Sequence, residues 1–277
     1  MRGLAEYVMH GRRRAIIVVI LTGLFPMVYC LSAAIVGLVN LRKSANEGLI
    51  ILLWSLLPAA LFWMAGESTP VVLMLSTAIL AQALKHFESW SKVVMLGTVL
   101  GILIQLSLVW QGAYVAQLVL IIDELIILQQ NQGVVINYTA DELVSLILGF
   151  YGAYHFATII MCLLLARWWQ SVLYNPGGFK TEFHQLRLEQ RFSILLAGFI
   201  LAAIAGVPPL SSWLVIMSIA PLLSGMALMH YFVAYRKLGF SWLVMAYLLA
   251  LFVSPMVIFL GLIDGIINFR KRISGAY

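Results

Sequence analysis

Charged side chains are scarce in this chain, and its cations avoid the apolar stretches. Asp, Glu, Lys and Arg make up 10% of the 277 residues, whereas soluble domains contain about 25%. The 17 Lys and Arg residues all lie outside the long apolar runs, and none occurs between Lys92 and Arg167. Loops on the cytoplasmic side of a membrane retain Lys and Arg, whereas translocated loops do not. This distribution of the cations predicts an integral membrane protein.

The sequence also lacks the motifs of soluble enzymes. It has no phosphate-binding loop, no glycine-rich dinucleotide motif, no H-E-x-x-H, no G-x-S-x-G and no C-x-x-C. Its two cysteines, Cys30 and Cys162, lie in apolar runs and resemble small buried hydrophobes rather than a disulfide or a metal pair. We therefore predict no enzyme activity, no cofactor and no metal site.

The net charge of +6 is spread over several short loops. A nucleic-acid-binding protein gathers its basic residues on one polar domain, which this chain lacks. The anionic inner leaflet of a membrane is the expected counter-charge, and nucleic acid is not an expected partner.

Apolar sequence is what the chain has in abundance. Apolar residues make up 63% of it, and its mean hydropathy is +1.01. The apolar runs span 15–41, 48–65, 70–84, 93–110, 143–166, 192–207, 212–232 and 238–269. Most are close to the ~20 residues of a membrane-crossing helix, and none shows the alternation of a β-barrel strand. The sequence predicts an all-α fold: one polytopic transmembrane helix bundle over 1–277, with about eight to ten membrane helices, some broken or short.

The basic stretches predict the direction of the central crossings. If they all face the cytoplasm, the middle six runs form three hairpins. The outer turns of these hairpins contain Glu67, the segment 111–142 and the Val-Pro-Pro sequence at 207–209.

The number of membrane crossings is harder to assign at the two ends of the chain. Basic residues flank the first run, 15–41, on both sides, but this run is too short for two full crossings. Pro26 offers a break between two short helices. The last run, 238–269, repeats this pattern. We expect a multi-pass protein of the bacterial cytoplasmic (inner) membrane, with the basic N-terminus (1–14) and the tail (270–277) in the cytoplasm.

The segment 111–142 is apolar for much of its length, but its charges are all acidic. Asp123 and Glu124 are adjacent, and each would cost about 2.5–3.5 kcal/mol at mid-bilayer. This cost favours a segment on the outer face, as a lid or a re-entrant segment.

One semi-polar stripe stands out in the run 143–166. Tyr151, His155 and Thr158 recur at helical spacing, and in lipid such a stripe faces protein or a cavity rather than acyl chains. We predict these three residues to line a small-molecule pocket. The alternative is that His155 forms a structural hydrogen bond within the bundle.

The segment 167–191 is the longest predicted cytoplasmic loop. It contains a compact turn, formed by Tyr174, Asn175, Pro176, Gly177, Gly178 and Phe179, and then Arg187. Asn-Pro-Gly-Gly is a strong turn signal. We predict a docking surface for a partner protein, and the alternative is an amphipathic connector on the membrane surface.

Small residues four apart occur at Gly97 and Gly101, and again at Gly198, Ala202 and Gly206. This spacing lets helix backbones approach closely, so it favours tight helix packing.

Asp264 is an acid close to the basic cluster 270–272. Pairing with these cations would make it a structural end-cap of the last helix, and the alternative is a proton relay.

Several sequence features resemble the YybS-like family of bacterial multispanning membrane proteins. They are the N-terminal basic stretch and Pro-broken run ending in Leu41-Arg42-Lys43, the 174–179 turn followed by Glu182-Phe183 and Leu186-Arg187-Leu188, and the closing Leu260-Gly261-Leu262-Ile263-Asp264 before Phe269-Arg270-Lys271-Arg272. The resemblance covers most of the chain.

That family is similar in hydrophobic layout to the S-components of energy-coupling-factor vitamin transporters. Those subunits bind a vitamin within a helical bundle and dock on a membrane coupling subunit through small residues. The resemblance therefore implies a small hydrophobic or vitamin-like ligand and a membrane partner protein, with Ala33 and Gly37 as a small-residue pair for docking.

Two functional hypotheses follow from the sequence. The first is a small-molecule-binding or transport subunit whose pocket is bordered by the Tyr151 and His155 stripe. The second is a non-transporting membrane scaffold or assembly factor that works through the segment 167–191.

Overall fold

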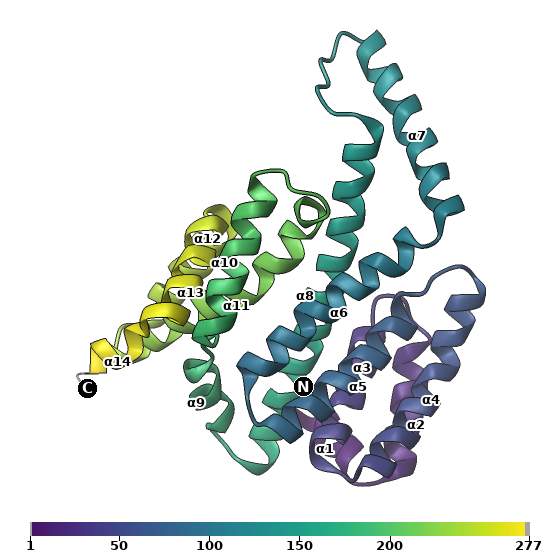
Figure 1. Cartoon of the computed structure of the whole chain (residues 1–277). Coiled ribbons are helices and arrows are strands. Elements are labelled where there is room, and N and C mark those ends of the chain that lie inside the picture. The colour runs from purple at the N-terminus through teal and green to yellow at the C-terminus, as the bar shows by residue number, and fades with distance from the viewer. Residues whose placement is uncertain (1, 275–277) are drawn as a thin grey trace.

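The computed structural model describes residues 2–274, and every regular element in that range is a helix (Figure 1). In chain order they are α1 (Arg2–Met9), α2 (Arg12–Gly23), α3 (Tyr29–Arg42), α4 (Ala45–Met64), α5 (Thr69–Phe87), α6 (Trp90–Val109), α7 (Gly112–Asn131), α8 (Ala140–Tyr174), α9 (Gly178–Gln185), α10 (Gln190–Ile204), α11 (Leu210–Tyr235), α12 (Phe240–Phe252), α13 (Ser254–Ile267) and α14 (Phe269–Ser274). Residue 1 of the predicted N-terminal stretch and residues 275–277 of the predicted tail lie outside the described range. The all-α prediction is confirmed.

Six helices within residues 2–274 are long and apolar enough to cross a membrane, namely α4, α5, α6, α7, α8 and α11. The pair α12 and α13 adds a seventh span if it is counted as one, although it bends by 106°. α3 and α10 are apolar, but they have only 14 and 15 residues. The chain is a multi-pass helical membrane protein, and the expected eight to ten crossings are not confirmed.

The first apolar run is divided at Pro26, as predicted, into α2 and α3. The hydroxyl of Ser32 donates to the carbonyl of Val19 at 3.0 Å, so the two helices fold back on each other. Every residue of α3 from Ser32 to Leu41 is buried. α3 is therefore a short core helix that the surrounding helices shield from lipid.

The basic helix ends meet at one end of the bundle, called the basic end below. The ammonium of Lys85 in α5 donates to the carbonyl of Lys43 after α3 at 2.6 Å. Arg167 of α8 pairs with Glu182 of α9 at the same end. The opposite, acidic end contains Glu67 in the α4–α5 turn and the connection between α7 and α8. The direction in which each helix crosses a membrane stays a prediction.

Glycines allow α6, α8 and α11 to cross closely. A Cβ added to Gly152 of α8 would lie 2.7 Å from the carbonyl oxygen of Gly101 in α6 and 2.7 Å from Ile216 in α11. A Cβ on Gly97 would collide with Phe156. The close packing predicted for Gly97 and Gly101 is therefore present.

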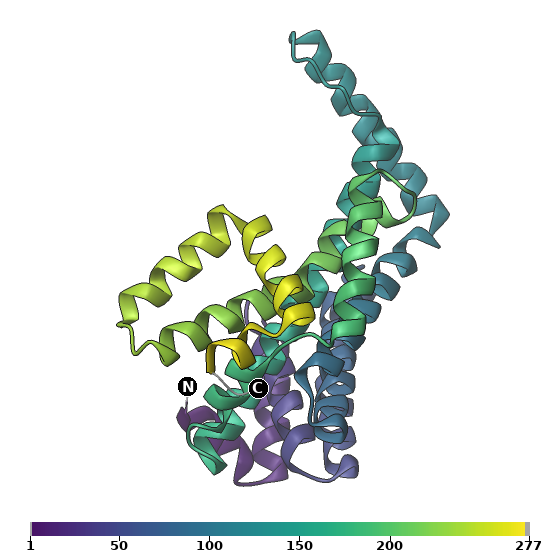
Figure 2. The same ribbon diagram turned by 60° about the vertical axis from the view of Figure 1, so that its left-hand side comes forward.

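α7 and the first part of α8 project from the acidic end (Figures 1 and 2). α8 has 35 residues, about 52 Å of helix, whereas the hydrocarbon core of a bilayer is ~30 Å thick. Thr139 and Glu142 form a capping box at its start. α7 packs against α8 and α6, with Ile126 as its only buried residue in the described chain. A lid role for 111–142 stays a prediction.

Candidate amphiphile site

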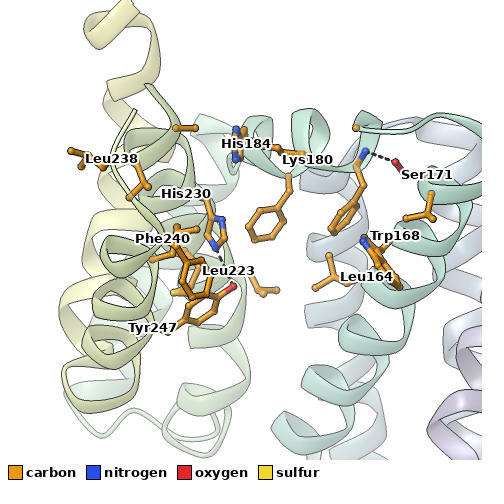
Figure 3. A pocket seen from close by; sticks show the side chains of 18 of the residues that line it. Leu164, Trp168, Ser171, Lys180, His184, Leu223, His230, Leu238, Phe240 and Tyr247 are labelled. Carbon is orange, nitrogen blue, oxygen red and sulfur yellow. Dashed lines mark hydrogen bonds between the residues drawn. The ribbon is translucent and has the colours of Figure 1, made fainter. Parts of the chain in front are cut away.

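A cavity of about 660 Å³ lies between the C-terminal halves of α8 and α11. α9 crosses one end of it, and α12 completes the wall (Figure 3). α8 and α11 touch near the acidic end, where a Cβ on Gly149 would collide with the carbonyl of Ser212. They separate toward the basic end, where Trp168 and His230 lie on different sides of the space.

The turn after α8 determines where α9 lies. The hydroxyl of Ser171 donates a hydrogen bond to the carbonyl of Asn175 at 2.8 Å. It also accepts one from the backbone N–H of Phe179 at 3.0 Å. Gly177 has a φ of 89°, a left-handed conformation that glycine adopts without strain. The chain reverses direction at this turn, and α9 consequently closes the end of the cavity with Phe179 and Phe183.

The wall between α8 and α11 is apolar. Met161 and Leu164 of α8 and Leu223 and Met226 of α11 line it. Water finds no hydrogen-bond partners beside such side chains. In a bilayer this part of the cavity therefore suits an acyl or prenyl chain better than a polar solute.

Polar side chains gather at the α9 end of the cavity. Nε2 of His230 lies 3.0 Å from the hydroxyl of Tyr247, and Lys180 and His184 of α9 line the same end. Burial lowers the pKa of His184 below its ordinary value, and the charges of Lys180, His230 and Arg270 lower it further. The ammonium of Lys180 and the ring N–H groups are donors suited to an oxyanion.

The predicted stripe of Tyr151, His155 and Thr158 does not line this cavity. His155 is 1% exposed, and its Nδ1 donates to the carbonyl of Tyr151 at 2.9 Å. The hydroxyl of Tyr151 lies 3.3 Å from that of Ser68, and Thr158 donates to the carbonyl of Tyr154 at 2.8 Å. These hydrogen bonds lie within the protein, as the structural alternative for His155 expects. Binding of a ligand at this stripe stays a prediction.

The predicted docking turn is held against the bundle. Tyr174 lies under the guanidinium of Arg42, 4.4 Å from ring centroid to Cζ. Arg187 donates to the carbonyl of Gly265 at 3.0 Å. Of the turn itself, Gly177 and Phe179 line the cavity. Docking of a partner through Asn175, Pro176 and Gly178 stays a prediction.

The sequence did not reveal the polar residues of this cavity. Lys180 and His184 lie in the predicted cytoplasmic loop 167–191, and His230 lies in the apolar run 212–232. They meet only because α8, α9, α11 and α12 pack together, and Tyr247 is 17 residues from His230. A histidine and a tyrosine on neighbouring apolar helices are the only local signal.

Comparison of the chain with protein families, curated proteins and solved structures found no match. Within residues 2–274, no three His, Cys, Asp or Glu side chains are grouped as metal ligands would be. The cavity combines an apolar wall with a polar end that contains the ammonium of Lys180 and two histidines, which is the chemistry of a site for an amphiphile.

Proposed function

We propose that this membrane protein binds an anionic amphiphile in the cavity between α8, α9, α11 and α12. The apolar part of the ligand lies along α8 and α11, and its charged head contacts Lys180, His184 and His230. The observation that carries the proposal is one cavity with an apolar wall and a polar end that contains Lys180 and two histidines. Its volume of about 660 Å³ falls within the ~300–1,000 Å³ of ligand pockets.

The distribution of charge supports an orientation for this site. Loops rich in Lys and Arg remain on the cytoplasmic side, so we propose that the basic end faces the cytoplasm of a bacterial inner membrane. The ligand head would then lie at the level of the inner-leaflet headgroups. A binding or transport subunit similar to the vitamin-transporter S-components is compatible with this site, and so is membership of the YybS-like family.

The test uses hexadecyl phosphate and its uncharged counterpart hexadecanol. We expect the phosphate to raise the Tm of the purified protein more than the alcohol does, because a ligand stabilises the state that binds it. Leu223→Trp should fill the space beside the apolar wall and abolish the ligand-induced rise in Tm. Replacing Lys180 and His184 together by Gln should reduce the rise in Tm caused by hexadecyl phosphate to the rise caused by hexadecanol.

His155→Ala is the matched control, because His155 is buried outside the cavity. It should leave the ligand-induced gain in Tm unchanged. If His155→Ala abolished the gain and Leu223→Trp did not, the ligand would bind at the Tyr151, His155 and Thr158 stripe. If mild-detergent extracts contained a protein partner that was lost on Tyr174→Ala, and no lipid-like ligand, the scaffold hypothesis would be favoured.

A further inference from the structure

α9 presents different residues to two separate cavities. One is the proposed ligand site between α8, α9, α11 and α12, called the amphiphile cavity below. Its lining includes Phe179, Lys180, Phe183 and His184 of α9. Glu182 points away from that cavity and lines a second one, of about 390 Å³, at the basic end. No residue of α9 is fully buried, so the helix depends on a few specific contacts for its position.

The carboxylate of Glu182 is bound much as a ligand would be. Nε of Arg167 donates to its Oε2 at 2.9 Å, and the adjacent terminal amino group of Arg167 donates to its Oε1. The indole N–H of Trp90 donates to Oε2 at 3.4 Å. A two-pronged contact between guanidinium and carboxylate is among the strongest charge-assisted hydrogen-bonding arrangements. The side chain of Arg167 is 14% exposed and that of Glu182 35% exposed, so solvent and solutes reach the carboxylate.

The second cavity continues beyond this ion pair. Its apolar walls include Leu41 and Leu84, and its polar lining includes Lys85, Glu88 and Gln170. The ammonium of Lys85 is bonded to backbone carbonyls, which carry no net charge. There is room beside Arg167 for a small molecule with a short apolar part.

The charges of this cavity favour a singly charged ligand. Two cations, Arg167 and Lys85, line it together with two carboxylates, Glu88 and Glu182. When one monoanion replaces the carboxylate of Glu182 in the cavity, the local charges remain balanced. A dianion would leave an excess of negative charge, which a partly buried site disfavours.

We propose that this cavity is a binding site for a small carboxylic acid, in which Glu182 is the internal occupant. An external carboxylate that pairs with Arg167 displaces Glu182 and thereby frees α9. The carboxylate site is independent of the amphiphile cavity. The further consequence, that freeing α9 opens the amphiphile cavity, rests on the proposed function.

The first experiment compares benzoate with benzamide, its neutral isostere, on the full-length protein in detergent without added amphiphile. Sodium chloride balances the ionic strength, because salt alone screens exposed ion pairs. We expect benzoate to speed hydrogen–deuterium exchange of the backbone amides of 178–189, and benzamide to have no such effect. Equal exchange with benzoate and with sodium chloride would overturn the proposal.

The second experiment removes the internal carboxylate. Glu182→Gln should tighten benzoate binding by roughly tenfold, because the site is no longer occupied by a competitor. It should also speed exchange of α9 before any ligand is added. Glu189→Gln is the matched control, since Glu189 is an exposed acid seven residues away, and it should change neither quantity. Unchanged benzoate affinity in Glu182→Gln would contradict the proposal.

Arg167 and Trp90 provide the remaining test. Arg167→Gln should abolish benzoate binding, and Trp90→Phe should weaken it while keeping the aromatic packing. Tight benzoate binding in a folded Arg167→Gln variant would also overturn the proposal. Neither readout involves an amphiphile, so failure of this proposal and failure of the proposed function can be told apart.

Discussion

Asp264 has no solvent exposure, and its contacts at the end of α13 compensate its charge. Its Oδ2 lies 3.2 Å from the guanidinium of Arg270, and its Oδ1 accepts the amide of Phe269 at 3.0 Å. Arg270 also donates to the carbonyl of Leu186 at 2.7 Å. The pair therefore ties α13 and α14 to the connector that precedes α10.

Asp264→Asn should destabilise the protein by about 3–5 kcal/mol, because it leaves the buried Arg270 without its counter-charge. The measurement is unfolding of the purified protein in detergent. Asp123→Asn removes an acid that is exposed on α7, and it should change stability by less than about 0.5 kcal/mol. Equal effects of the two substitutions would show that the Asp264 pair is not essential.

The contrast between Asp264 and the amphiphile cavity shows what a sequence reveals about single residues. Asp264 and Arg270 are six positions apart, so their pairing at a helix end could be predicted locally. The polar end of the cavity joins Lys180, His184, His230 and Tyr247 from three different helices. No spacing in the sequence encodes that meeting, which depends on the crossing angles of α8, α9, α11 and α12.

At the level of whole helices, the lack of a side chain at Gly152 allows α6, α8 and α11 to pack closely. Gly152→Ala should cost about 1–3 kcal/mol, since the new methyl group meets a backbone carbonyl and Ile216 in a packed core. Gly198→Ala in α10 is the matched control, because no atom lies within 4 Å of its added Cβ. There a gain of up to about 1 kcal/mol from helix propensity is expected. Comparable losses in both variants would contradict this account of the packing.

At the level of elements, the sequence predicted where helices break better than it predicted how long they are. Pro26 divides α2 from α3 because a proline disrupts the backbone hydrogen bonds of a helix interior. α8 instead runs through Asp141, Glu142 and Arg167 at the two edges of its apolar run. Hydropathy identifies the part of a helix that suits lipid, and polar residues with good helix propensity continue the helix beyond it. For the same reason, a count of apolar runs differs from a count of full crossings.

The molecule as a whole is divided into a basic end and an acidic end, and this division can be tested. Single cysteines replace Lys43, Lys85 and Lys180 in one set and Glu67 and Asp141 in the other, in a background with Cys30 and Cys162 replaced by Ala. A membrane-impermeant maleimide should label the first set only from the cytoplasmic face and the second set only from the outer face. Labelling of Lys85→Cys and Lys180→Cys from opposite faces would contradict the arrangement.

This division of charge has an electrical consequence. An inverted molecule would have to carry its cations through the voltage across the membrane, at about 2.3 kcal/mol per elementary charge for each 100 mV. The carboxylates that project with α7 and α8 would have to move in the opposite sense. With the basic end in the cytoplasm, as proposed above, both displacements would be uphill in a cell whose interior is negative, so the membrane voltage would favour that orientation over the inverted one.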